Sequence, residues 1–220
     1  MSDPLEPICA SGLQFFGKVS ASISHELKNV LAVLNENAGL LEDLSLAAER
    51  GKPLVPEQVK RVSENIHKQI RRADDILKTM NRFAHSVDYF SAEVDLYELV
   101  SLVSVLASRL AAMRNLTFVV TTPEKPVIFH SNPFLVENLV WFCLEYAMAR
   151  EGGKGPVQLI PTKKSGKIAL SVVGSASFTA GYPEHFPGAA APLAAVLGAT
   201  LVAGDSADEL VVYFPERKNE

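Results

Sequence analysis

One histidine, His25, is followed by residues that suit phosphoryl chemistry. Glu26 comes directly after it, and Asn29 lies four residues further on. A neutral imidazole nitrogen can attack phosphorus, because the ordinary pKa of a histidine side chain is about 6.5. A neighbouring carboxylate can accept the other ring proton or stabilise the developing imidazolium. An amide one helical turn away can orient a phosphoryl oxygen or a water. His25, Glu26 and Asn29 are therefore the candidate catalytic residues.

Helical geometry places His25 on the polar side of its helix, and the other histidines are interpreted as structural. At about 100° per residue, His25 points about 200° away from Leu27 on a helix, and so away from the apolar side. A histidine on a solvated helix face most often has no chemical role. We interpret His67 and His85 in that way, and His130 and His185 as strand-end or loop residues. Spacing alone makes His25 an exposed histidine with a suitable neighbour.

A long helical pair must position these residues. The stretch from about 8 to 50 contains no proline and only three glycines. Its apolar residues recur in steps of three and four, which predicts a helix with one apolar stripe. The stripe consists of Val19, Ile23, Leu27, Val30, Leu34, Ala38, Leu41 and Leu44.

A second helix is predicted from about 57 to 90, after a turn over 51–56 that contains glycine and proline. Its stripe consists of Val59, Val62, Ile66, Ala73, Ile76, Met80, Phe83 and Val87. A hairpin of this length leaves one side of each stripe uncovered, and a second copy would cover it in a four-helix bundle. We therefore expect a homodimer.

The second part of the chain has a mixed pattern. Helices are predicted over 96–114, 132–150 and 189–197, and strands over 116–121, 157–161, 167–173, 200–203 and 209–214. A few strands with helices on one side form an α+β layer. We expect two domains, a helical hairpin over residues 1–92 and an α+β domain over residues 93–220.

Composition excludes several classes of function. The net charge of −4 lacks the basic footprint of a nucleic-acid binder. Cys9 and Cys143 fit neither a disulfide framework nor a zinc site, as in a reduced cytoplasmic protein. The start of the chain does not resemble a signal peptide, and no run reaches the roughly 18 apolar residues of a membrane span. We expect a cytoplasmic protein that neither spans a membrane nor binds nucleic acid.

The stretch Ser24-His25-Glu26-Leu27-Lys28-Asn29 resembles the phosphoacceptor box of two-component sensor histidine kinases. In that family the histidine accepts phosphate, the acidic residue assists proton transfer, and the Asn or Thr three residues beyond the acid aids dephosphorylation of the partner. The resemblance implies these roles for His25, Glu26 and Asn29. Val30 replaces the proline that usually follows and bends the helix. Residues 69–83 resemble the second bundle helix of the family, and the mixed part resembles its ATPase domain.

The motifs that bind ATP in the family are changed here. Glu145 occupies the position of the asparagine that holds magnesium, and Tyr146 that of the small residue after it. Gly174 replaces the aspartate that reads adenine, and Phe178 replaces a glycine that lets the backbone approach the nucleotide. The glycine-rich lid is shortened to residues 182–191. A phosphate cradle needs free backbone N–H groups at a helix start, and this segment supplies few.

These features favour a histidine phosphotransferase that exchanges phosphate between His25 and the Asp of a response-regulator receiver domain, without ATP, metal or another cofactor. It resembles dimeric phosphotransferases whose ATPase-like domain binds no nucleotide. Three alternatives remain open. The first is an active kinase in which Glu145 is an unusual metal ligand. The second is a non-enzymatic module that binds a regulator, and the third is a receiver phosphatase that depends on Asn29.

Overall fold

The computed structural model describes residues 5–150, 155–164, 167–174, 179 and 182–216. The chain divides into two compact units. Ser20–Arg82 form the helical unit, and Met1–Val19 together with Phe83–Glu220 form the α/β unit. No helix among the described residues is long and apolar enough to cross a membrane.

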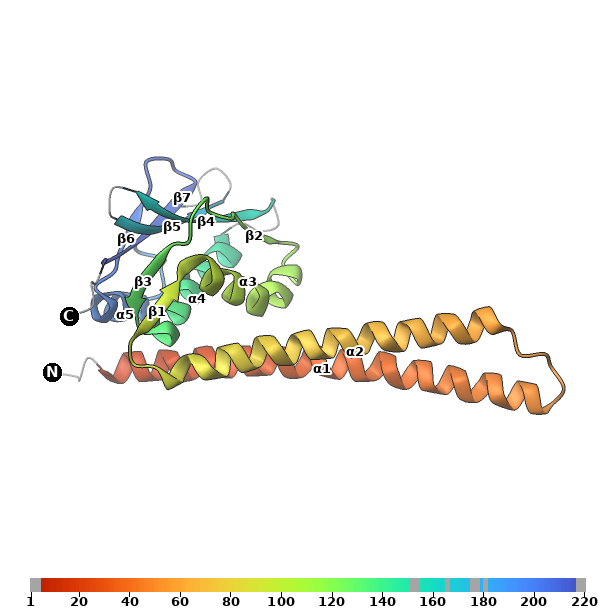
Figure 1. Cartoon of the computed structure of the whole chain (residues 1–220). Helices are drawn as coiled ribbons and strands as arrows, with labels where there is room; N and C mark the ends of the chain where they lie inside the picture. Colours follow the sequence, from red (N-terminus) through yellow and green to blue (C-terminus); the bar gives the residue numbers. More distant parts are fainter. Residues whose placement is uncertain (1–4, 151–154, 165–166, 175–178, 180–181, 217–220) are drawn as a thin grey trace. The chain divides into compact units, whose positions relative to one another are not determined.

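The helical unit consists of most of two antiparallel helices, α1 (Leu5–Glu49) and α2 (Pro56–His85) (Figure 1). Gly51 follows α1 in the left-handed region, with a φ of 84° that glycine adopts without a steric cost. Its N–H donates to the carbonyl of Ala48 and closes the end of the helix. The predicted turn over 51–56 is therefore confirmed.

The predicted apolar stripes are largely confirmed. On α1, Val19, Ile23 and Val30 are buried, but Ala38 is exposed and Asn37 takes the buried position beside it. The amide of Asn37 donates to the carbonyl of Val33 at 2.7 Å, which satisfies one of its polar groups inside the helical pair.

The second helix ends earlier than predicted. It stops at His85, and a short 3-10 helix, η1 (Ser86–Asp88), follows, so that Val87 is 54% exposed instead of in the stripe. The buried hydroxyl of Ser86 donates to the carbonyl of Phe83, and His85 Nδ1 lies 2.7 Å from Asp88 Oδ2. Such local side-chain bonds compete with continuation of the helix.

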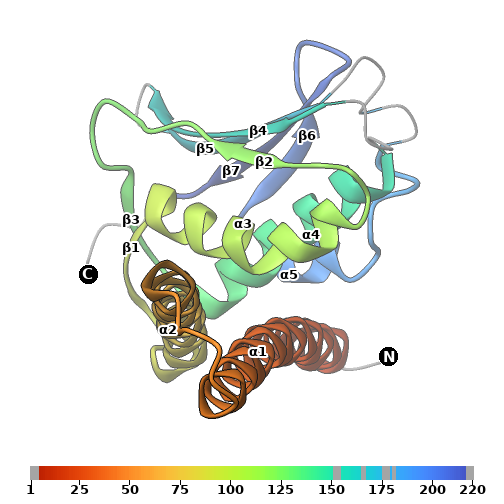
Figure 2. The ribbon, with the colours of Figure 1, turned by 90° about the vertical axis from the view of Figure 1, so that its right-hand side faces the viewer.

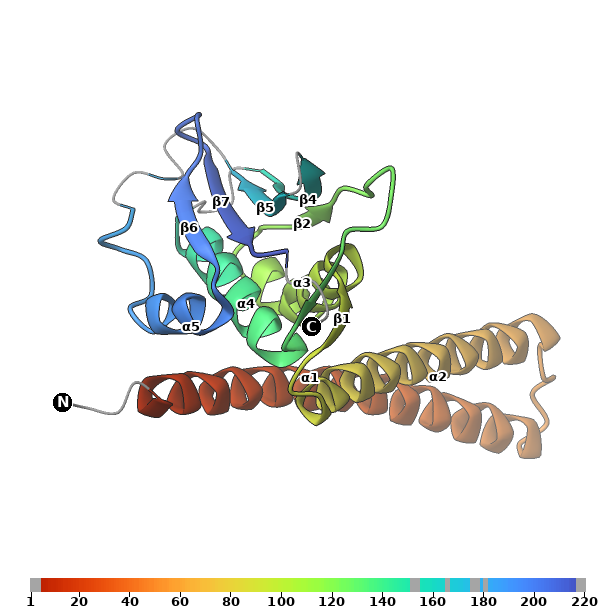
Figure 3. The ribbon, with the colours of Figure 1, turned by 60° about the vertical axis from the view of Figure 1, so that its left-hand side comes forward.

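The α/β unit contains a five-stranded sheet in the order β2-β4-β5-β7-β6. Strand β2 is parallel to β4, and the other neighbours are antiparallel. Helices α3, α4 and α5 cover one face of the sheet (Figures 2 and 3), which confirms the predicted layer of helices on one side. The elements are β1 (Ala92–Asp95), α3 (Leu96–Ala112), β2 (Phe118–Val120), β3 (Ile128–Ser131), α4 (Pro133–Arg150), β4 (Val157–Lys164), β5 (Lys167–Val173), α5 (Ala190–Leu197), β6 (Thr200–Ala203) and β7 (Glu209–Phe214).

Strand β4 continues past Pro161, where the sequence pattern predicted its end. The N–H of Val157 and the carbonyl of Leu159 bond to the segment that contains β2, so the backbone of Pro161, two residues on, also faces that side. The register with β2 ends at Leu159, and beyond it this side of β4 is open. The N–H that proline lacks therefore costs no bond in the sheet.

The pair β1 and β3 was not predicted. These four-residue strands form a separate antiparallel two-stranded sheet, with Glu93 opposite His130 and Val94 opposite Phe129. Only Val94 is buried in β1 and only Phe129 in β3, so neither strand has the repeated apolar pattern that identifies longer ones. Asp95 ends β1 and caps α3, because its carboxylate accepts from the N–H of Tyr97 at 2.9 Å.

Candidate functional site

His25 lies in the middle of α1 and is exposed, as the helical spacing predicts. Asn29, one turn further along, is exposed on nearly the same face, and so is Lys28. No described residue forms a hydrogen bond or ion pair with the His25 ring. The imidazole, an amide and a cationic amine thus share an open helical surface that a partner protein can reach.

Glu26 lies on a different side of α1. It is half-buried, next to the face that carries the buried Ile23 and Val30. Successive residues on a helix diverge by about 100° and do not face each other. Accordingly, the Glu26 carboxylate forms no hydrogen bond with His25 within the described part of this chain.

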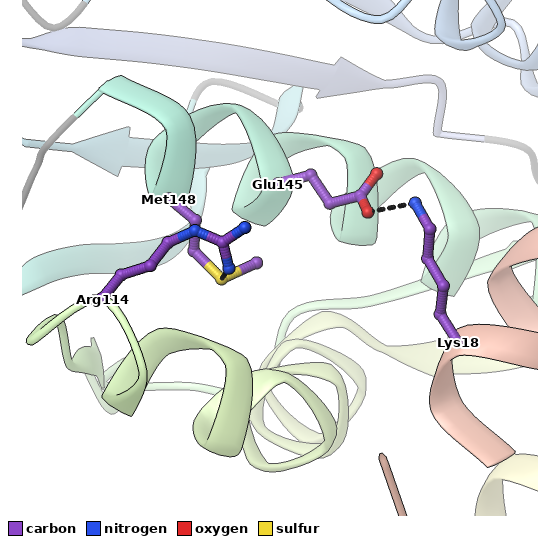
Figure 4. A network of polar contacts seen from close by, with 4 residues as sticks. All are labelled: Lys18, Arg114, Glu145 and Met148. Atoms are coloured by element: carbon purple, nitrogen blue, oxygen red, sulfur yellow. Dashed lines mark hydrogen bonds and ion pairs between the residues drawn. The ribbon is translucent and has the colours of Figure 1, made fainter. Parts of the chain in front are cut away.

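Glu145, at the position that resembles the magnesium-binding asparagine, is paired with a residue of α1. Its carboxylate accepts from the ammonium group of Lys18, and the two side chains are 24% and 48% exposed (Figure 4). Beside this pair, the guanidinium of Arg114 lies 3.8 Å from Met148 Sδ and donates to the carbonyl of Leu110 at 3.3 Å. Glu145 is therefore engaged as an anion by a cation of its own chain.

Tyr146 fills space between α4 and the segment before α5. It is only 2% exposed, and its ring lies 5.2 Å from that of Phe186, which in turn lies 5.6 Å from the ring of Tyr182. Burial raises the pKa of the Tyr146 hydroxyl, and the guanidinium of Arg150, 5.9 Å from the ring, opposes that shift. Packed aromatic rings therefore occupy the space beside Tyr146, where the resemblance implies a small residue.

The short lid segment is held by further contacts. The hydroxyl of Tyr182 donates to the carbonyl of Leu201 in β6 at 2.9 Å, and burial raises its pKa. Helix α5 then begins at Ala190, and its N-cap residue Ala189 provides no side-chain hydrogen bond. Gly174 follows β5 directly, and its N–H donates to the carbonyl of Asp208. Phe178 lies outside the described residues.

An aromatic cluster at the start of α1 was not identified in the sequence. The Phe15 ring is 2% exposed and lies 5.1 Å from Phe83, 5.2 Å from Trp141 and 5.7 Å from Phe134. The pattern assigned α1 to the helical hairpin as a whole, yet its first turns pack within the α/β unit. Phe15 continues the spacing of the α1 stripe four residues before Val19, which was the available signal.

No group of three or more His, Cys, Asp or Glu side chains among the described residues could hold a metal ion. Cys143 is fully buried, and burial raises the pKa of its thiol to about 12, whereas Cys9 is exposed. Trp141 and Phe142 are buried in α4, as expected of core residues.

No protein-family model and no curated protein matches the chain. The chain is similar to several solved histidine kinase structures. The match to the catalytic domain of histidine kinase ThkA covers 57% of this chain and 97% of that one, with 14% identity and a TM-score of 0.47. The match to Acinetobacter baumannii histidine kinase AdeS covers 88% and 98%, with 12% identity and a TM-score of 0.46. The match to the cytoplasmic segment of histidine kinase QseC covers 67% and 95%, with 14% identity and a TM-score of 0.45. At these values the likeness concerns the course of the backbone and carries no argument about activity.

Proposed function

We propose that this chain is a histidine phosphotransferase of two-component signalling, which exchanges phosphate between His25 and the aspartate of a response-regulator receiver domain without binding ATP. The observation that carries the proposal is a contrast. The phosphoacceptor-like stretch presents an exposed His25, whereas Glu145 and Tyr146 are engaged by side chains of their own chain.

In the proposed reaction, a neutral nitrogen of His25 attacks the phosphorus of an aspartyl phosphate on the receiver. The new N–P bond forms as the P–O bond to the aspartate breaks, and the receiver carboxylate leaves with the electron pair. Positive charge then develops on the imidazole, where Glu26 stabilises it or accepts the remaining ring proton. Lys28 and Asn29 are exposed beside the ring and balance or orient the phosphoryl oxygens. The reverse sequence returns phosphate to the receiver.

We further propose that two copies pair through the helical unit into a four-helix bundle, with residues 1–92 as the functional phosphoacceptor domain and residues 93–220 as the ATPase-like domain. Both helices carry large apolar side chains that one chain leaves exposed: Leu31 is 62% exposed, Leu40 46%, Ile70 51% and Leu77 45%. A second copy would remove this surface from water, at about 25 cal/mol per Å² of apolar area. Sedimentation analysis of the wild type and an Ile70→Glu/Leu77→Glu variant tests the pairing.

The test of the transfer reaction uses a receiver carrying labelled phosphate. We expect label to appear on the wild-type chain and on a His67→Ala variant, which removes another exposed histidine of the helical unit. The His25→Ala variant should stay unlabelled. Label on His25→Ala at the wild-type level, or on none of the three proteins with any receiver tested, would contradict the proposal. If Asn29→Ala stops receiver dephosphorylation while His25→Ala does not, the chain acts as a phosphatase instead.

A further inference from the structure

The first turns of α1 pack within the α/β unit through apolar contacts, a hydrogen bond and an ion pair. Phe15 lies among rings from the end of α2 and from α4, as described above. Gly12 permits the close approach of Phe134, since a Cβ there would lie 3.2 Å from its ring. Phe15 is 2% exposed, and Val19, one turn further along α1, is fully buried. We call the contacts of residues 8–19 of α1 with the end of α2 and with α4 the joint. Opening the joint would expose several aromatic rings to water at once.

Polar contacts join the same two helices. The buried amide of Asn138 in α4 donates to the hydroxyl of Ser11 in α1 at 3.2 Å, and Ser11 donates to the carbonyl of Ile8 at 2.9 Å. In addition, the ammonium group of Lys18 in α1 forms an ion pair with the carboxylate of Glu145 in α4 (Figure 4). Separation of α1 from α4 would exchange the Asn138–Ser11 hydrogen bond for bonds to water, so this bond fixes how the two helices pair more than it adds to stability.

From these contacts we infer that the first turns of α1, the end of α2 and the α/β layers form one locked body, in which Phe15 is the central residue. The helix that carries His25 therefore begins inside the α/β unit. The contacts between residues 8–19 of α1 and helix α4 stay closed while phosphate is transferred at His25. This last statement rests on the proposed function, whereas the locked joint itself does not.

Native-state hydrogen exchange on the full-length chain tests the joint without any assay of activity. We expect the amides of residues 8–19 in α1 and 136–147 in α4 to exchange through one shared opening. Phe15→Ala should lower the protection of both segments together by about tenfold or more. Leu13→Ala, which removes a 75% exposed side chain from the same turns, should change neither segment. If residues 8–19 exchange faster than α4 in the wild type, or if Phe15→Ala affects only α1, the joint is not locked.

A cross-link tests whether the closed joint is compatible with phosphotransfer. In a Cys9→Ser background, Lys18→Cys and Glu145→Cys can be joined by a short bis-maleimide, because the two native side chains touch. We expect transfer from a phosphorylated receiver to stay within about twofold of the uncross-linked protein. Loss of transfer on cross-linking alone would show that the joint has to open during transfer and would overturn the inference that it stays closed. Absence of label in both forms would reject the proposed phosphotransfer. Hydrogen exchange would then still show whether the joint is locked.

Discussion

The α1 face around His25 and the α4 region around Tyr146 differ in what their side chains contact. His25 and Asn29 are exposed, and no described residue bonds to the His25 ring. Tyr146 is buried against Phe186, and Glu145 is paired with Lys18. The first region leaves its reactive group available to a partner. The second region uses its side chains for packing and for contacts within the chain. The comparison shows that the two regions, both singled out in the sequence, differ in whether their side chains are already engaged within the chain.

The largest expected effect concerns the aromatic cluster that joins α1 to α4. Phe15→Ala should lower the free energy of unfolding by about 3–5 kcal/mol, because it leaves a cavity among three aromatic rings. Phe16→Ala is the matched control, since Phe16 is 40% exposed and contacts only Phe83 among the aromatic rings of the described chain. It should cost about 1 kcal/mol. Urea denaturation measures both, and equal losses would show that Phe15 is not the central residue.

Next to the open face, Glu26→Gln should slow transfer to His25 by about 10²-fold, because the amide can neither accept a proton nor stabilise the imidazolium as a carboxylate does. Stability should hardly change, as Glu26 is only half-buried. Glu36→Gln removes an exposed carboxylate from the same helix and should leave the rate unaltered. Initial rates from a labelled receiver provide the measurement. Equal rates in all three proteins would remove Glu26 from the proposed mechanism.

The buried thiol of α4 predicts a dependence of stability on pH. Burial raises the pKa of Cys143 from 9.0 to about 12, so the folded state holds this proton more tightly than the unfolded state. The stabilisation is complete below pH 9 and is lost as the pH rises toward 12. Between pH 8 and pH 10 the chain should lose about 1.4 kcal/mol of unfolding free energy from this group. Cys143→Ala should remove that part of the slope and Cys9→Ala should retain it, as urea midpoints will show. Identical slopes in the two variants would contradict the assignment.

The smallest expected effect concerns the ion pair in Figure 4. A double-mutant cycle with Lys18→Met and Glu145→Gln should give a coupling of about 0.5–1 kcal/mol, since Lys18 is half-exposed and solvent screens the pair. The coupling should decrease as salt is added. A coupling of several kcal/mol that is insensitive to salt would mean that the pair, rather than Phe15, holds the joint.

Element length did not decide how well the sequence pattern predicted the fold. The bounds of β6 and β7 agree with the prediction, and α4 differs from it by one residue. The strands β1 and β3 were missed, because four residues with one buried side chain each carry little periodic signal. The end of α2 was misplaced, because local bonds of Ser86 and His85 decide it.

The candidate site was predicted unevenly for a similar reason. Exposure of His25 and Asn29 follows from helical geometry alone. The partners of Glu145 and Phe15 could not be predicted, because Lys18 and Trp141 are 127 and 126 residues away in sequence. A helical stripe shows which side is buried, but it does not show what covers that side.

The central claim is that phosphate reaches His25 from a receiver and not from ATP bound to this chain. The most direct measurement incubates the wild-type chain in parallel with γ-labelled ATP and magnesium, and with a receiver that carries labelled phosphate. His25→Ala serves as the control in both reactions. The account predicts label on the wild type from the receiver only, and none on His25→Ala. Label that reaches His25 from ATP alone would contradict it.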